Sequence, residues 1–170
     1  IYNGFISLAY SNTIIDNVHI KNERLTCSIE NGAIYTGGLI SSASDLIIRN
    51  SSVPGLYVNL DGEINNAMVG GLVGNGSNVR IENSFVQDVD INTKGVLIYY
   101  GIGGIIGRDS GGIIRYCYAT GNIKTDGEDV GGIYGYSTGT VERNFSFVNL
   151  HSATDYLGGI GGYDNNSSTV

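Results

Sequence analysis

Apolar residues along this chain occur in short runs, and the runs return with glycine at a long interval. A glycine followed by two apolar residues recurs six times, with a looser last copy. Neither a heptad nor an amphipathic stretch of helix length separates the copies, which favours strands over helices. The opening glycines, at spacings of 34, 33, 33, 28 and 27 residues, are Gly4, Gly38, Gly71, Gly104, Gly132 and Gly159.

A β-branched residue follows each of the first five glycines at an offset of nine to eleven residues. Repeats of this length are typical of solenoids, whose successive units stack and share one core. We therefore predict an all-β fold, a right-handed parallel β-helix (β-solenoid) of about five to six coils. Its core ladder would be Ile15, Ile48, Ile81, Ile114 and Val141.

The residue after each member of that ladder carries a charge whose sign alternates along the chain. Strands stack about 4.8 Å apart, so each inner charge would lie between two opposite charges. An exposed pair contributes only about 0.2–1 kcal/mol, so this charge ladder would select the register more than it stabilises the fold. Its members are Asp16, Arg49, Glu82, Arg115 and Glu142.

Further glycines indicate where strands bend. From Gly38 onward each opening glycine follows a second glycine, as expected where a side chain would collide with a neighbouring coil. Dipeptides that end in glycine predict turns between short strands, three to a coil, because glycine adopts positive φ without strain. They are Asn31-Gly32, Asp61-Gly62, Lys94-Gly95 and Asp126-Gly127.

The composition argues against a nucleic-acid-binding protein, a membrane-inserted protein and a disulfide-linked fold. The chain has 27 glycines, about twice the usual share, and one proline. A net charge of −7 argues against nucleic acid as a partner, and no apolar run approaches the ~20 residues that membrane insertion needs. Cys27 and Cys117 are interpreted as small apolar residues three coils apart, too distant for a disulfide, so we expect two free thiols.

Three segments carry a resemblance to a known family. They read GGLVG…IENSF, GGIIG…IRYCYATGNI and GGIYG…VERNFSFVNL, and the stretch from Gly103 to Ile123 is the closest. This pattern resembles the bacterial GLUG motif. The first two units depart from it, because Ser7 and Ser41 replace the closing glycine and Pro54 interrupts the second unit.

The resemblance implies an extracellular location, secreted or attached to the cell wall. GLUG repeats are known in zinc metalloproteases that cleave immunoglobulin A and in adhesins. The resemblance therefore implies a non-catalytic scaffold or substrate-docking region of such a protease, with an adhesin repeat region as the alternative. The partners expected are a host protein (immunoglobulin) or a glycan, and neighbouring domains of the same chain.

No catalytic, cofactor-binding or metal-binding residues are predicted. His19 and His151 would lie four coils apart, ~19 Å by strand spacing, and neither opens a His-Glu-x-x-His zinc motif. A polysaccharide-lyase-like β-helix is the third hypothesis, since two carboxylate clusters could hold calcium weakly. They are Asp88 with Asp90, and Asp126 with Glu128 and Asp129. Solvated turn carboxylates are far commoner than calcium ligands.

Tyrosines gather around the later glycine markers and form the candidate interaction surface, since exposed aromatic residues anchor many protein and glycan complexes. Filling of coil corners is an equally good interpretation. We treat residues 1–170 as a single solenoid domain from a larger protein that continues on both sides, with uncapped ends that favour end-to-end association. The tyrosines are Tyr99, Tyr100, Tyr134, Tyr136, Tyr156 and Tyr163.

Overall fold

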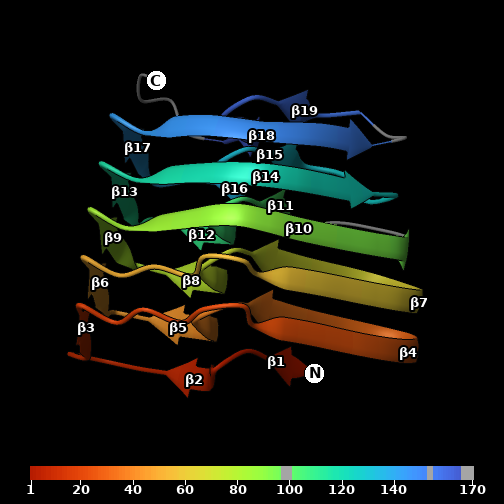
Figure 1. Ribbon diagram of the computed structural model, residues 1–170, viewed down its shortest axis with the longest axis horizontal. Helices are drawn as coiled ribbons and strands as arrows, with labels where there is room; N and C mark the ends of the chain where they lie inside the picture. Colours follow the sequence, from red (N-terminus) through yellow and green to blue (C-terminus); the bar gives the residue numbers. More distant parts are fainter. Residues whose placement is uncertain (97–100, 153–154, 166–170) are drawn as a thin grey trace.

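The computed structural model describes residues 1–96, 101–152 and 155–165, which form strands and turns without a helix. The strands belong to three parallel sheets whose strands stack along one axis, with β1 at one end of the stack and β19 at the other (Figure 1). The predicted parallel β-solenoid is thus confirmed. No helix among these residues is long and apolar enough to cross a membrane.

Each turn of the chain runs through sheet B, then sheet C, then sheet A. Sheet B holds β2 (Ile6–Ala9), β5 (Ile40–Ser44), β8 (Val73–Ser77), β12 (Ile106–Ser110), β16 (Tyr134–Ser137) and β20 (Gly161–Asp164). Sheet C holds β3 (Ile14–Asp16), β6 (Ile47–Arg49), β9 (Arg80–Glu82), β13 (Ile113–Arg115) and β17 (Thr140–Glu142).

Sheet A is the broadest face. It holds β1 (Tyr2–Asn3), β4 (Arg24–Gly37), β7 (Tyr57–Gly70), β10 (Phe85–Val96), β11 (Ile102–Gly103), β14 (Tyr118–Thr125), β15 (Val130–Gly131), β18 (Phe145–Ser152) and β19 (Leu157–Gly158). Four complete turns separate β3 from β17, with partial turns beyond each. The coil number therefore differs slightly from the five to six expected.

The expectation of three short strands per coil is wrong for sheet A, where β4 and β7 each run through 14 residues. The dipeptides Asn31-Gly32 and Asp61-Gly62 lie inside these strands instead of ending them. The register shifts at Asn31-Gly32 where β4 pairs with β7, and at Asp61-Gly62 where β7 pairs with β10. The φ angle is 98° at Asn31 and 120° at Gly62, so the chain bends there while pairing continues. A Cβ atom on Gly62 would lie 2.1 Å from the Ile29 carbonyl oxygen, so the second coil needs glycine at this bend.

Two sharp corners lie at the ends of sheet C and are made mostly by residues with positive φ. Before sheet C the corner residues are Asn12, Asp45 and Asn78, with φ of 61°, 53° and 52°. Asparagine and aspartate tolerate this left-handed conformation better than other non-glycine residues. After sheet C the corner residues, with φ between 47° and 58°, are Asn17, Asn50, Asn83, Tyr116 and Arg143.

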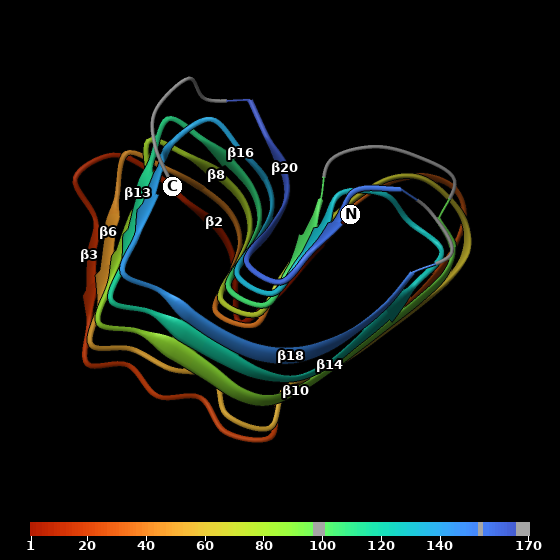
Figure 2. The same cartoon turned by 90° about the horizontal axis from the view of Figure 1, so that it is seen from above.

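Seen along the axis, each coil folds back on itself, so that sheet B faces the last segments of sheet A (Figure 2). The two walls touch through their backbones. A Cβ atom on Gly107 would lie 2.5 Å from the Val69 nitrogen, and one on Gly135 would lie 2.2 Å from the Ile102 nitrogen. This contact explains why the fifth residue of the GG-x-x-G pattern is glycine in the later coils.

Candidate functional site

The predicted core ladder forms one row through sheet C. Ile15 pairs with Ile48, Ile48 with Ile81, Ile81 with Ile114, and Ile114 with Val141. The three middle isoleucines are fully buried, whereas Val141 is partly exposed. This row is structural, and it fixes the register in which the outward side chains of sheet C meet.

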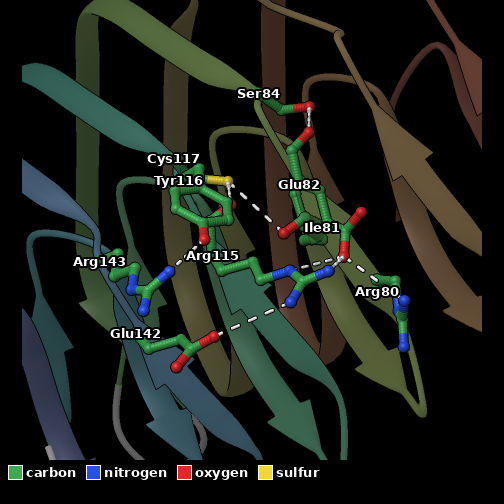
Figure 3. A network of polar contacts seen from close by, with 9 residues as sticks. All are labelled: Arg80, Ile81, Glu82, Ser84, Arg115, Tyr116, Cys117, Glu142 and Arg143. Carbon is green, nitrogen blue, oxygen red and sulfur yellow. Dashed lines mark hydrogen bonds and ion pairs between the residues drawn. The ribbon is translucent and has the colours of Figure 1, made fainter.

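The predicted charge ladder forms in two pieces. Arg49 contacts Asp16 at 2.8 Å, and Arg115 contacts Glu82 at 2.7 Å and Glu142 at 3.9 Å. Arg49 and Glu82 are register partners, yet Glu82 pairs with Arg115 and with Arg80, 3.5 Å away (Figure 3). Arg49 turns toward Asp16 instead, where Asn50 also donates to the same carboxylate, and these contacts hold the pKa of Asp16 below its usual value.

An aromatic residue and two arginines occupy the corner beyond this ladder. Tyr116 is 44% exposed, and the guanidinium carbons of Arg115 and Arg143 lie 5.7 and 5.5 Å from its ring centroid. Arg143 also donates to the Tyr116 hydroxyl (Figure 3). Neither residue type favours positive φ, so the arginine–tyrosine contact stabilises a corner that asparagine forms in the earlier coils.

A row of side chains behind these corners links the coils, and sequence reasoning missed it. The Ser51 hydroxyl donates to the Arg49 carbonyl and accepts from the Val18 N–H, and Ser84 makes the same two bonds one coil later. The next members are Cys117 and Asn144. The row could have been found from the sequence, because each of its four members directly follows one of the corner residues after sheet C.

Cys117 is therefore a member of a hydrogen-bonding row. Its Sγ lies 3.2 Å from the Arg115 carbonyl oxygen, and its N–H donates to Asn144 Oδ1 at 2.9 Å. Burial raises the pKa of its thiol to about 12, partly offset by the bonds from Ser84 and to Arg115. Both cysteines are free, as expected, and Cys27 is partly exposed.

The six tyrosines of the predicted interaction surface do not all lie on one surface. Tyr134 lies in the core, 4% exposed, in register with Ile106, whereas Tyr99 and Tyr100 lie outside the described residues. The remaining three form a cluster near the end of sheet B. Tyr136 stacks on Tyr163 at 5.6 Å between centroids, and Tyr156 meets Tyr163 edge-on at 5.4 Å.

Arg108 extends this tyrosine cluster by one coil. Its guanidinium carbon lies 5.6 Å from the Tyr136 ring centroid, and Asn165 donates to the Tyr136 hydroxyl at 3.2 Å. Tyr156 and Tyr163 are 54% and 37% exposed. We define the tyrosine cluster as Arg108, Tyr136, Tyr156 and Tyr163.

A buried carboxylate in sheet B was not predicted. Asp109 is fully buried and accepts from the Ser137 hydroxyl at 2.9 Å and from the Gly112 N–H at 3.0 Å. Burial raises the pKa of Asp109, and these two bonds act in the opposite direction. The Gly112 bond closes the bend after β12, and the Ser137 bond links β12 to β16 in the next coil, so the role of Asp109 is structural.

The two histidines lie in different coils, as the sequence predicted. His19 Nδ1 lies 2.7 Å from Ser52 Oγ, and His151 lies at the end of β18. Within the described ranges, no three His, Cys, Asp or Glu side chains are close enough to hold a metal ion.

Comparison with protein families gives a match in the middle of the chain. The model of the GLUG motif matches residues 98–124, which include β11, β12, β13 and most of β14. Comparisons with curated proteins and with solved structures give no match. The chain thus contains a GLUG motif within a solenoid repeat.

Proposed function

We propose that this chain is a non-catalytic interaction module of a secreted or cell-wall-attached bacterial protein, and that the tyrosine cluster is its protein-docking surface. The observation that carries the proposal is the stacked array Arg108–Tyr136–Tyr163, capped edge-on by Tyr156. Arg108, Tyr136 and Tyr163 are held by neighbouring strands of sheet B, and Tyr156 reaches them from the segment just before β19.

Tyrosine and arginine are enriched among the residues that dominate binding energy in protein complexes. A tyrosine side chain loses little conformational entropy on binding, and the backbone register here already fixes its position. Tyr136 pairs with Tyr163 and with Arg108 across β16, β20 and β12. Preorganisation of this kind supports docking by a rigid surface.

The resemblance to GLUG-containing proteases suggests the partner. We propose that the module docks immunoglobulin A for a zinc metalloprotease domain elsewhere in the same protein. Surface plasmon resonance with purified immunoglobulin A tests this directly. We expect saturable binding that weakens at least tenfold in a Tyr156→Ser, Tyr163→Ser double variant, since each central aromatic side chain contributes about 1–2 kcal/mol or more.

Tyr10→Ser is the matched control, because Tyr10 is 58% exposed and lies in the first coil, far from the tyrosine cluster. Its affinity for immunoglobulin A should equal that of the unsubstituted chain. Absence of binding to immunoglobulin A would remove the protease-docking role and leave the adhesin alternative. Equal losses in both variants would show that the tyrosine cluster is not the docking surface.

A further inference from the structure

A groove of about 700 Å³ opens at the corner between sheets B and C in the early coils, away from the tyrosine cluster. Its volume is within the range of small-ligand sites, about 300–1,000 Å³. Neither the GLUG match nor the proposed docking role assigns it a function. It is lined by Ser11, Asn12, Asp45, Leu46, Ile47, Asn78, Val79, Arg80 and Ile113.

One side of the groove is a polar row with one member per coil. Asn12, Asp45 and Asn78 occupy the same left-handed corner, joined by backbone bonds from Asn12 to Asp45 and from Asp45 to Ser77. Asn78 Nδ2 also donates to Asp45 Oδ1 at 2.8 Å. Because neighbouring strands are about 4.8 Å apart, these side chains present oxygen and nitrogen atoms at that interval along the axis.

The other side of the groove is largely apolar. Leu46 and Val79 are buried beneath it, and Ile47 and Ile113 are half-exposed at its edge. Arg80 lies between Ile47 and Ile113 in the register of sheet C. The groove therefore combines a carboxylate and two carboxamides with an aliphatic wall.

We propose that this groove binds a linear neutral polysaccharide that runs along the solenoid axis, with one sugar beside each coil. An equatorially linked pyranose chain advances by a length close to the spacing of the coils, so sugars beside the first three coils would meet Asn12, Asp45 and Asn78 in turn. A fourth sugar would lie beside Ile113. An extended peptide rises about 3.3–3.4 Å per residue and would not keep this register.

The chemistry of the lining fits sugar hydroxyls. A carboxylate accepts hydrogen bonds only, while the carboxamides both donate and accept, which matches the mixed capacity of a hydroxyl. Bonds from Asn78 and Ser44 hold the pKa of Asp45 below its usual value, so this carboxylate is ionised near neutral pH. Arg80 lies on the other side of the groove, so the lining carries one charge of each sign and no net charge. The C–H faces of the sugars would pack on the aliphatic wall, and a lining without net charge suits uncharged sugars.

The test is isothermal titration calorimetry of the chain with β-1,4-linked oligomers of glucose and of N-acetylglucosamine, two to six sugars long. The groove extends over four coils, from Asn12 to Ile113. The dissociation constant should therefore fall with oligomer length up to about four sugars and then level off. Lack of binding by both series, or affinity that keeps rising to six sugars, would overturn the proposal.

Asp45→Gly removes the central polar group without disturbing the corner, because Gly111 occupies the equivalent position in the fourth coil. We expect at least a tenfold loss of affinity for the tetrasaccharide. Asn83→Gly is the matched control: Asn83 has a similar φ of 47° but lies at the other corner, outside the groove. Circular dichroism would verify that both variants fold.

Further outcomes decide between ligand classes. Tighter binding of a galacturonate oligomer or of an extended peptide, lost in Asp45→Gly, would replace the neutral polysaccharide with that ligand and overturn the proposal. The Tyr156→Ser, Tyr163→Ser variant should bind the tetrasaccharide normally. Loss of immunoglobulin A binding and loss of sugar binding are therefore separate results, carried by different residues.

Discussion

At the scale of single residues, the side chain behind each sheet C corner decides how neighbouring coils are joined. Ser51 and Ser84 each fill a place where a backbone N–H of the preceding coil needs an acceptor. Cys117 fills the same place with sulfur, a weaker hydrogen-bonding atom. The identity of this residue is therefore governed by hydrogen bonding as much as by size.

Substitution of Cys117 tests this interpretation. Cys117→Ser should leave the free energy of unfolding within about 1 kcal/mol of the original, because serine makes these bonds in two neighbouring coils. Cys117→Val, similar in size but unable to bond, should lower it by about 1–3 kcal/mol. Urea unfolding followed by circular dichroism gives both values. Equal stability of the serine and valine variants would show that only volume matters.

The same burial predicts different reactivities for the two thiols. A pKa of about 12 keeps Cys117 protonated at neutral pH, and the thiol is also shielded from solvent. Cys27 is partly exposed. A chromogenic disulfide reagent at neutral pH should titrate one thiol per folded chain promptly, and two in denaturant. Prompt reaction of both thiols in the folded chain would contradict this assignment.

Glu23 gives the fold a specific dependence on pH. Its Oε2 atom is buried without a hydrogen-bond partner in the described structure, and burial raises its pKa from 4.5 to about 7. The folded state therefore favours the protonated form. The stabilisation is complete below the unfolded pKa and is lost as pH rises from about 4.5 to about 7.

Glu23→Gln removes this ionisation. Because the group is only half-buried, we expect the variant to be more stable than the unsubstituted chain by about 1 kcal/mol at pH 8, and nearly equal to it at pH 4. Urea unfolding at both pH values measures the difference. A difference that stays constant with pH would show that Glu23 ionises normally in the folded chain.

At the scale of elements, the contact between sheet B and the returning segments of sheet A depends on glycine. A Cβ atom on Gly107 would meet backbone atoms of Val69 and Gly74 at 2.5 and 2.6 Å, so one wall must move. Gly111, in the turn after β12, has φ of 75° and nothing within 4 Å of an added Cβ. The two glycines serve packing and turn geometry respectively.

Alanine at the two positions should therefore have unequal effects. Gly111→Ala should cost about 1–2 kcal/mol, the strain of a left-handed non-glycine residue. Gly107→Ala should cost more, about 3 kcal/mol or above, because backbone atoms in a packed interface cannot rotate away. Thermal and urea unfolding would rank them. The reverse order would mean that the walls separate easily.

The residues that repeat from coil to coil could be predicted from the sequence, whereas the bends inside the long strands could not. Ile48, Ile81 and Ile114 recur at constant intervals on a buried face, so their row could be derived without coordinates. The placement of Tyr134 could have been found in the same way, because it aligns with Ile106 in the marker. The bend at Asn31-Gly32 inside a continuous strand could not, since a turn and a bulge use the same residues.

At the scale of the molecule, the solenoid should behave as a row of coupled units. Gly37 and Gly70 are register partners one coil apart, so deletion of residues 38–70 would join Gly37 to Gly71 and close the gap by one whole coil. We expect this shortened chain to keep its β-sheet circular dichroism per residue. Deletion of residues 38–54, about half a coil, should abolish cooperative folding.

The alternating charges make the one-coil deletion a test of register as well. Removal of one coil takes away Arg49 and brings Asp16 beside Glu82, two like charges in neighbouring strands. The shortened chain should therefore unfold at a higher urea concentration after Asp16→Asn, which removes this repulsion. In the full chain the same substitution should destabilise, because Asp16 contacts Arg49 at 2.8 Å. Urea unfolding should show that Asp16→Asn changes the free energy of unfolding with opposite sign in the two chains, and that both changes are smaller in high salt. A change of the same sign in both chains would show that charge does not help to select the register.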